Sequence, residues 1–144
     1  DGGWEDAWDE QMGRDVYRHV RALQPSILVN NRVGKALEGM AGTSARGAFA
    51  ADYDTPEQQV GRYRDDRPWE SCITICKQWA WKPDDALKPL AECIETLVTC
   101  AGGDGNLLLN VGPMPSGQIV ASAPPAIITS AAPCSIRRPA APIE

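Results

Sequence analysis

The acidic residues and the tryptophans are the side chains of this sequence from which a reactive or binding site could be built. Cleavage of a glycosidic bond requires two carboxyl groups, one as nucleophile or base and one as proton donor, held about 5 to 5.5 Å apart in retaining enzymes. The chain has 19 acidic residues, and we expect most of them to be solvated surface. A pair of carboxyl groups therefore has no diagnostic value until its position in the fold is considered.

Tryptophan is the more unusual residue type, with five in 144 residues. Trp79 and Trp81 lie just beyond a predicted strand, and an aromatic face stacks well on the C–H face of a sugar. Core packing is the alternative interpretation. It is the better one for Trp4 and Trp8, which share one stripe of a predicted helix, and it stays open for Trp79.

The overall charge narrows the class of ligand. A formal net charge of -5 argues against nucleic acid or an anionic membrane as partner, because phosphate-rich surfaces are bound by clustered Lys and Arg. No apolar run approaches the roughly 18 residues of a membrane span. Five cysteines without a Cys-x-x-Cys pair, and His19 as the one histidine, argue against a zinc site. Neutral ligands such as sugars remain open.

Apolar periodicity predicts the elements that must position these residues. Apolar side chains at near-helical spacing predict a helix over about 5–23, and Pro25 ends it. The short run at 27–29 predicts a buried parallel strand that ends in the polar residues 30–32. Residues 33–68 lack sustained periodicity, and an irregular segment of that length in a compact domain is usually functional or disordered.

The second half of the chain predicts a strand, a helix and a further strand. The strands cover 71–76 and 107–111, and the helix begins near Pro89 and ends at Gly102. This alternation is typical of an α/β protein with a parallel sheet, either a (β/α) barrel or a doubly wound sheet. Three strands cannot close an eight-unit barrel of about 250 residues, so we expect part of a larger domain.

Loops at the carboxyl ends of parallel strands face the ligand in such architectures. Arg32 follows one predicted strand directly, and the acidic segment 52–57 lies on the loop beyond it. Asp1 would hold an equivalent position if a strand precedes it. These residues are the first candidates for a site.

Five blocks of the sequence occur in an informative order. They are Asp1-Gly2-Gly3-Trp4-Glu5, Val29-Asn30-Asn31-Arg32, Asp52-Tyr53-Asp54-Thr55-Pro56-Glu57-Gln58, Pro68-Trp69-Glu70-Ser71-Cys72 and Gly105-Asn106-Leu107-Leu108-Leu109-Asn110-Val111-Gly112-Pro113. Each block alone is weak. Together, over residues 1 to about 119, they resemble the α-L-fucosidases of glycoside hydrolase family 29.

The resemblance implies an α/β fold, a partial (β/α)8-like (TIM-type) barrel, from an enzyme that removes terminal α-L-fucose with retention of configuration. Its nucleophile falls on Asp1 and its acid/base on Glu57, with Glu70 as the runner-up for the acid/base role. Arg32 matches an arginine that binds the sugar, and Trp79 matches an aromatic residue that packs against the C6 methyl group of fucose. The implied partner is a fucosylated oligosaccharide or glycoconjugate, with no metal or organic cofactor, outside the cytoplasm (extracellular or periplasmic).

Two departures from the family pattern qualify this expectation. The arginine block more often reads Asn-Asp-Arg, so Asn31 replaces an acid and could alter the orientation of Arg32. Residues 1–120 match a partial catalytic barrel, its C-terminal half, whereas 121–144 form an Ala/Pro-rich tail that we expect to be disordered and that suggests a frame slip or truncation near Val120. The alternative is therefore a non-catalytic truncated fragment with residual carbohydrate binding, and we expect this chain alone to be inactive. The leucine-rich block is assigned no chemistry.

Overall fold

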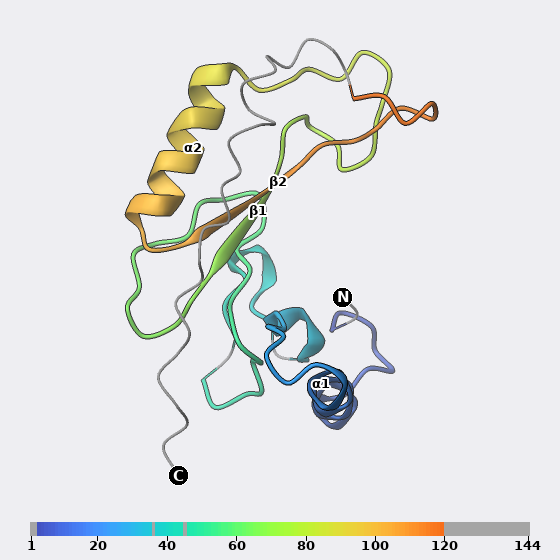
Figure 1. The fold of residues 1–144 in the computed structure, drawn as a ribbon, viewed down its shortest axis with the longest axis vertical. Coiled ribbons are helices and arrows are strands. Elements are labelled where there is room, and N and C mark those ends of the chain that lie inside the picture. The colour runs from blue at the N-terminus through green and yellow to red at the C-terminus, as the bar shows by residue number, and fades with distance from the viewer. Residues whose placement is uncertain (1–2, 36, 45, 120–144) are drawn as a thin grey trace.

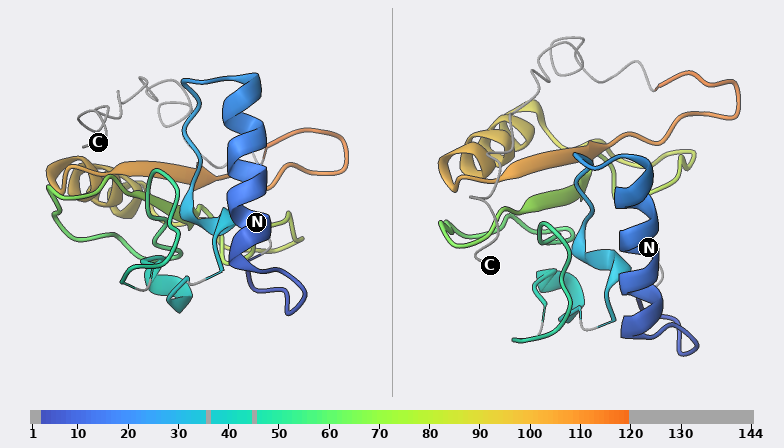
Figure 2. Two further views of the ribbon diagram at one scale, coloured as in Figure 1. Left: turned by 90° about the horizontal axis from the view of Figure 1, so that it is seen from below. Right: turned by 60° about the horizontal axis from the view of Figure 1, so that its bottom comes forward.

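The computed structural model describes residues 3–35, 37–44 and 46–119. Asp1 and the predicted tail at 121–144 lie outside these residues. The elements follow one another as α1 (Glu10–Leu23), η1 (Asn31–Val33), η2 (Gly39–Ala41), β1 (Glu70–Thr74), α2 (Leu90–Gly102) and β2 (Asn106–Asn110). The two helices lie apart from each other, α2 beside the strand pair and α1 beside η1 (Figures 1 and 2).

Helix α1 begins at Glu10, so the predicted start at residue 5 was wrong. Asp9 is the N-cap, and its carboxylate accepts a hydrogen bond from the backbone N–H of Met12 at 2.7 Å. Trp8 continues the apolar stripe but belongs to the preceding turn, where its indole N–H donates to the carbonyl of Val33 at 2.9 Å. The apolar spacing therefore extends one turn beyond the helix because Trp8 anchors the turn.

Strands β1 and β2 are parallel neighbours in register from Glu70 opposite Asn106 to Thr74 opposite Asn110. Both strands and α2 agree with the sequence prediction to within two residues. The helix connects the two strands and packs on β2, as a parallel pair requires of its crossover. This unit confirms the α/β class with parallel strands.

Two further segments extend this sheet through single bridges. Asn30 pairs with Tyr53, Asp54 with Trp69 and Glu57 with Cys72, all in parallel orientation. Segments 29–31, 52–57, 69–74 and 106–110 therefore lie in this order as one parallel array. The structure corrects two expectations: 27–29 forms no regular strand, because Asn30 caps η1 immediately afterwards, and 52–57 is strand-like within the segment predicted to be irregular.

The buried core lies between the array and α2. Its apolar members are Trp69, Ile73, Ile75, Cys93 and Cys100. Trp69 is packed so closely that a Cβ on Gly105 would lie 2.3 Å from its indole ring. The glycine lets the chain pass over the tryptophan directly before β2 begins. In the described part of the chain the parallel array does not close into a barrel.

Candidate active site

A pocket of about 380 Å³ opens on one face of the parallel array. It is lined by Asn30, Arg32, Thr55, Glu57, Glu70, Cys72, Trp79 and Leu108. Three neighbouring segments each contribute two residues that are two positions apart. Side chains two apart point to the same side of extended backbone, which explains the pairs Thr55/Glu57 and Glu70/Cys72, whereas Arg32 enters the pocket from η1.

Four of the five residues selected from the sequence meet in this pocket. Arg32, Glu57, Glu70 and Trp79 all line it, although the first and the last lie 47 positions apart in the sequence (79 − 32). Asp1, the fifth, lies outside the described residues. The pocket therefore contains two carboxyl groups, a guanidinium and an aromatic ring. These are the groups that the sequence analysis expects in a sugar site.

Arg32 and Glu57 form an ion pair inside the pocket. The guanidinium Nη2 donates to the Glu57 carboxylate, and their side chains are 15% and 25% exposed, so both are largely shielded from water. Arg32 Nε also donates to the hydroxyl of Thr55 at 3.1 Å. The pocket thus holds Arg32 by more than one acceptor, which restricts the orientation of its planar guanidinium.

Glu70 occupies a different environment. Burial raises the pKa of its carboxyl group above the ordinary value of 4.5. Desolvation disfavours the charged form, so Glu70 keeps its proton to a higher pH than a solvated glutamate does. The pocket therefore holds two carboxyl groups in different environments, because Glu57 is paired with Arg32 whereas Glu70 is desolvated.

The raised pKa of Glu70 predicts a pH dependence of stability. Between the unfolded-state pKa and the higher folded-state pKa, the folded protein binds more protons than the unfolded chain, so the free energy of unfolding falls as pH rises through this interval. Glu70→Gln is expected to remove this part of the decline, measured by urea unfolding at a series of pH values. A variant that keeps the full slope of the wild-type curve would show that another group causes it.

The remaining wall of the pocket is apolar. Trp79 lies in the turn region after β1 and is 40% exposed, and Leu108 on β2 is 45% exposed. Cys72 lines the pocket beside Glu57 on the neighbouring segment, and burial raises the pKa of its thiol. A thiol held in its protonated form is a poor nucleophile, so Cys72 contributes surface rather than covalent chemistry.

Sequence reasoning missed four residues of the pocket, namely Asn30, Thr55, Cys72 and Leu108. Leu108 belongs to the leucine-rich block that was given only a structural role. The signal that would have found Thr55 and Cys72 is alternation, because each lies two positions from a residue already selected. That signal was hidden for Thr55 because its segment was not recognised as strand-like.

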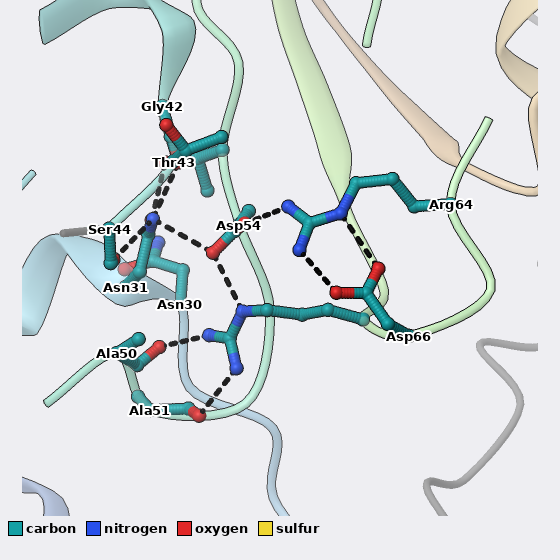
Figure 3. A network of polar contacts seen from close by, with 12 residues as sticks. Asn30, Asn31, Gly42, Thr43, Ser44, Ala50, Ala51, Asp54, Arg64 and Asp66 are labelled. Carbon is teal, nitrogen blue, oxygen red and sulfur yellow. Dashed lines mark hydrogen bonds and ion pairs between the residues drawn. The ribbon is translucent and has the colours of Figure 1, made fainter. Parts of the chain in front are cut away.

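Behind the pocket, Asp54 forms the centre of a buried polar cluster (Figure 3). Arg64 Nη1 and Arg67 Nε each donate to its carboxylate at 2.7 Å, and Asn31 Nδ2 donates at 3.2 Å. Arg67 also donates to the backbone carbonyls of Ala50 and Ala51. The Asp54 side chain is only 3% exposed, so these donors replace the water that it loses. The cluster ties segment 52–57 to the segments on either side.

Among the described residues, no group of three or more His, Cys, Asp or Glu side chains is arranged to hold a metal ion. No helix within the described ranges has both the length and the apolar character needed to cross a membrane.

Carboxyl groups and an arginine beside an apolar, aromatic wall, on a parallel α/β scaffold, are the residue types that a glycoside hydrolase site contains. The family model described as alpha-L-fucosidase matches residues 1–127. The chain belongs to the α-L-fucosidase family, glycoside hydrolase family 29.

Relatives of known structure or curated sequence share this assignment. The structure is similar to alpha-L-fucosidase isoenzyme 1 from Paenibacillus thiaminolyticus, with 32% identity and a TM-score of 0.65, over 81% of this chain and 28% of that one. It also resembles an alpha-L-fucosidase from Bacteroides thetaiotaomicron, with 23% identity and a TM-score of 0.68, over 83% of this chain and 30% of that one. The sequence is 28% identical to tissue alpha-L-fucosidase of Homo sapiens over 83% of this chain. The chain spans about a quarter of the length of the curated relatives it matches.

Proposed function

We propose that the protein hydrolyses terminal α-L-fucosides with retention of configuration, by double displacement. The observation that carries the proposal is the convergence of Arg32, Glu57, Glu70 and Trp79 in one pocket, because the first three were selected from separate blocks of the sequence and Trp79 from outside them. The substrate is a fucosylated oligosaccharide or glycoconjugate. A neutral sugar is compatible with a formal net charge of -5.

In the first step, the Asp1 carboxylate attacks the anomeric carbon while Glu57 donates a proton to the departing glycosidic oxygen. The bond between sugar and aglycone breaks, and a covalent fucosyl-enzyme forms. In the second step, Glu57 takes a proton from water, whose oxygen attacks the same carbon and releases Asp1. Each carboxyl group ends the cycle in its starting form.

The ion pair between Arg32 and Glu57 gives substrate binding a second effect. Sugar hydroxyls that accept hydrogen bonds from Arg32 would compete with Glu57 for its guanidinium. Release from Arg32 would then leave the Glu57 carboxyl group available to the glycosidic oxygen of the substrate. Arg32 is thereby both a substrate-binding residue and a regulator of its catalytic neighbour.

Trp79 supplies the preference for a 6-deoxy sugar. Its exposed ring forms the apolar part of the pocket together with Leu108. A methyl group in an aromatic pocket provides about 1 to 3 kcal/mol of discrimination, and a hydroxylated C6 would leave its hydroxyl without a partner there.

Covalent trapping tests the proposed nucleophile. The Bacteroides thetaiotaomicron relative has been crystallised as a trapped covalent intermediate with 2-fluoro-fucosyl fluoride. The same reagent, applied to the product of the complete coding sequence, is expected to add one 2-fluoro-fucosyl group to the peptide that contains Asp1. Intact-mass and peptide-level mass spectrometry measure it, and Asp1→Asn is the control that should remain unlabelled.

Other outcomes of this experiment are equally informative. Labelling of Glu57 or Glu70 in place of Asp1 would overturn the assignment of the nucleophile. Binding of fucose in calorimetry without labelling or hydrolysis would support the alternative, a non-catalytic protein that retains carbohydrate binding.

A further inference from the structure

Asn31 lies behind the pocket at the centre of a buried hydrogen-bond network, although its side chain does not line the pocket. Only 1% of its surface is exposed. Its amide nitrogen donates to the carbonyl of Gly42 at 2.5 Å, to the hydroxyl of Ser44 at 3.2 Å and to the carboxylate of Asp54 at 3.2 Å. Figure 3 shows these contacts converging on the amide from three directions.

The surroundings determine which way the amide points. The Gly42 carbonyl and the Asp54 carboxylate can only accept hydrogen bonds, so they require the nitrogen of Asn31 on their side. Its oxygen is then directed to Thr55, whose hydroxyl donates to it at 2.8 Å. An aspartate at this position, as in the more common form of the motif, would place a second acceptor against Gly42 and Asp54. Asn31 is thus matched to its neighbours in this chain.

Thr55 transmits this orientation into the pocket. A hydroxyl has one proton, and the Thr55 proton is committed to Asn31. The lone pairs of the same oxygen are left to accept the hydrogen bond from Arg32 Nε at 3.1 Å. Thr55 is only 4% exposed, so water cannot readily replace either partner.

We propose that Asn31 and Thr55 are positioning residues that hold the guanidinium of Arg32, and through it the carboxylate of Glu57, in the orientation used by the site. The effect on turnover rests on the proposed function, whereas the effect on Arg32 does not. Asn31 does not line the pocket, and the Thr55 hydroxyl is engaged by Asn31 and Arg32. Their influence passes through one directed path, from Asn31 to Thr55 to Arg32 to Glu57.

Thr55→Val tests the path because valine preserves the shape of threonine and removes the hydroxyl. In the product of the complete coding sequence, the Nε–H signal of Arg32 in nitrogen-15 NMR, assigned by its loss in Arg32→Lys, is expected to shift and to exchange faster with water. The kcat/KM for an aryl α-L-fucoside should fall by about 10- to 100-fold, as expected for one hydrogen bond to a charged group. Thr55→Ser, which restores the hydroxyl, should recover both the wild-type Arg32 signal and the wild-type kcat/KM.

A matched control and a second variant complete the experiment. Thr96→Val removes a hydroxyl that donates to the carbonyl of Glu92 on α2. Because this hydroxyl is not part of the pocket, the variant should change neither the NMR signal of Arg32 nor kcat/KM. Asn31→Ala should shift the Arg32 signal as Thr55→Val does. An Arg32 signal that is unchanged in a folded Thr55→Val protein would overturn the proposal. A shifted signal in a protein whose wild type hydrolyses no fucoside would instead refute the proposed function and leave the positioning role intact.

Discussion

Glu57→Ala, made in the product of the complete coding sequence, is expected to lower the kcat for hydrolysis of an aryl α-L-fucoside by about 100- to 10,000-fold, the usual contribution of general acid and base catalysis. The variant loses the proton donor to the leaving oxygen and the base that activates water. Steady-state kinetics with aryl fucosides of graded leaving-group pKa measure the effect. The loss in the first step should grow as the leaving group becomes more basic, because such groups depend more on protonation.

Azide separates the two roles of a carboxyl group in this reaction. It attacks the fucosyl-enzyme as an anion and needs no base, so it should restore turnover to Glu57→Ala and give a fucosyl azide of retained configuration. In Asp1→Ala it would replace the nucleophile itself and give the inverted product. The configuration of the azide therefore distinguishes the acid/base from the nucleophile.

Glu70→Ala is the matched comparison, because Glu70 lines the same pocket and is the runner-up for the acid/base role. Burial raises the pKa of its carboxyl group, a property that suits a proton donor, so the comparison is a genuine test. We expect Glu70→Ala to reduce activity without rescue by azide. Near-normal turnover by Glu57→Ala, together with azide rescue of Glu70→Ala, would transfer the acid/base role to Glu70.

Asp54→Ala is expected to lower the free energy of unfolding by about 3 kcal/mol, at the lower end of the cost of removing one partner from a buried ion pair. Asp54 is 3% exposed and accepts from Arg64 and Arg67, which are 30% and 23% exposed and regain some water in the variant. The cost is moderated by that partial exposure. Urea unfolding followed by circular dichroism measures it.

Asp66→Ala is the control for this prediction. Asp66 pairs with Arg64 on the surface, where its side chain is 67% exposed, and an exposed ion pair contributes little to stability. The control should unfold close to the wild-type midpoint. A loss in Asp54→Ala no larger than in Asp66→Ala would show that the buried cluster does not stabilise segment 52–57.

The elements that follow a strong local pattern were predictable from the sequence. Strands β1 and β2 and helix α2 have apolar runs that begin next to a glycine or proline, and they were predicted to within two residues. The resemblance carried by the sequence selected Arg32 and Glu57, together with Glu70 and Trp79, and these residues line one pocket. The start of α1 was missed because the cap at Asp9 and the hydrogen bond of Trp8 decide it, and apolar spacing reports neither.

The sequence by itself determined the family, the parallel α/β class and the residue types that the site needs. Tertiary structure alone decided that segments 29–31 and 52–57 are neighbours, because the bridge from Asn30 to Tyr53 joins residues far apart in the chain. Parallel pairing is non-local, so the pattern within a segment does not name its partner. That pairing places Asn31, Thr55 and Arg32 in one path to Glu57 and gives the buried Asp54 its partners.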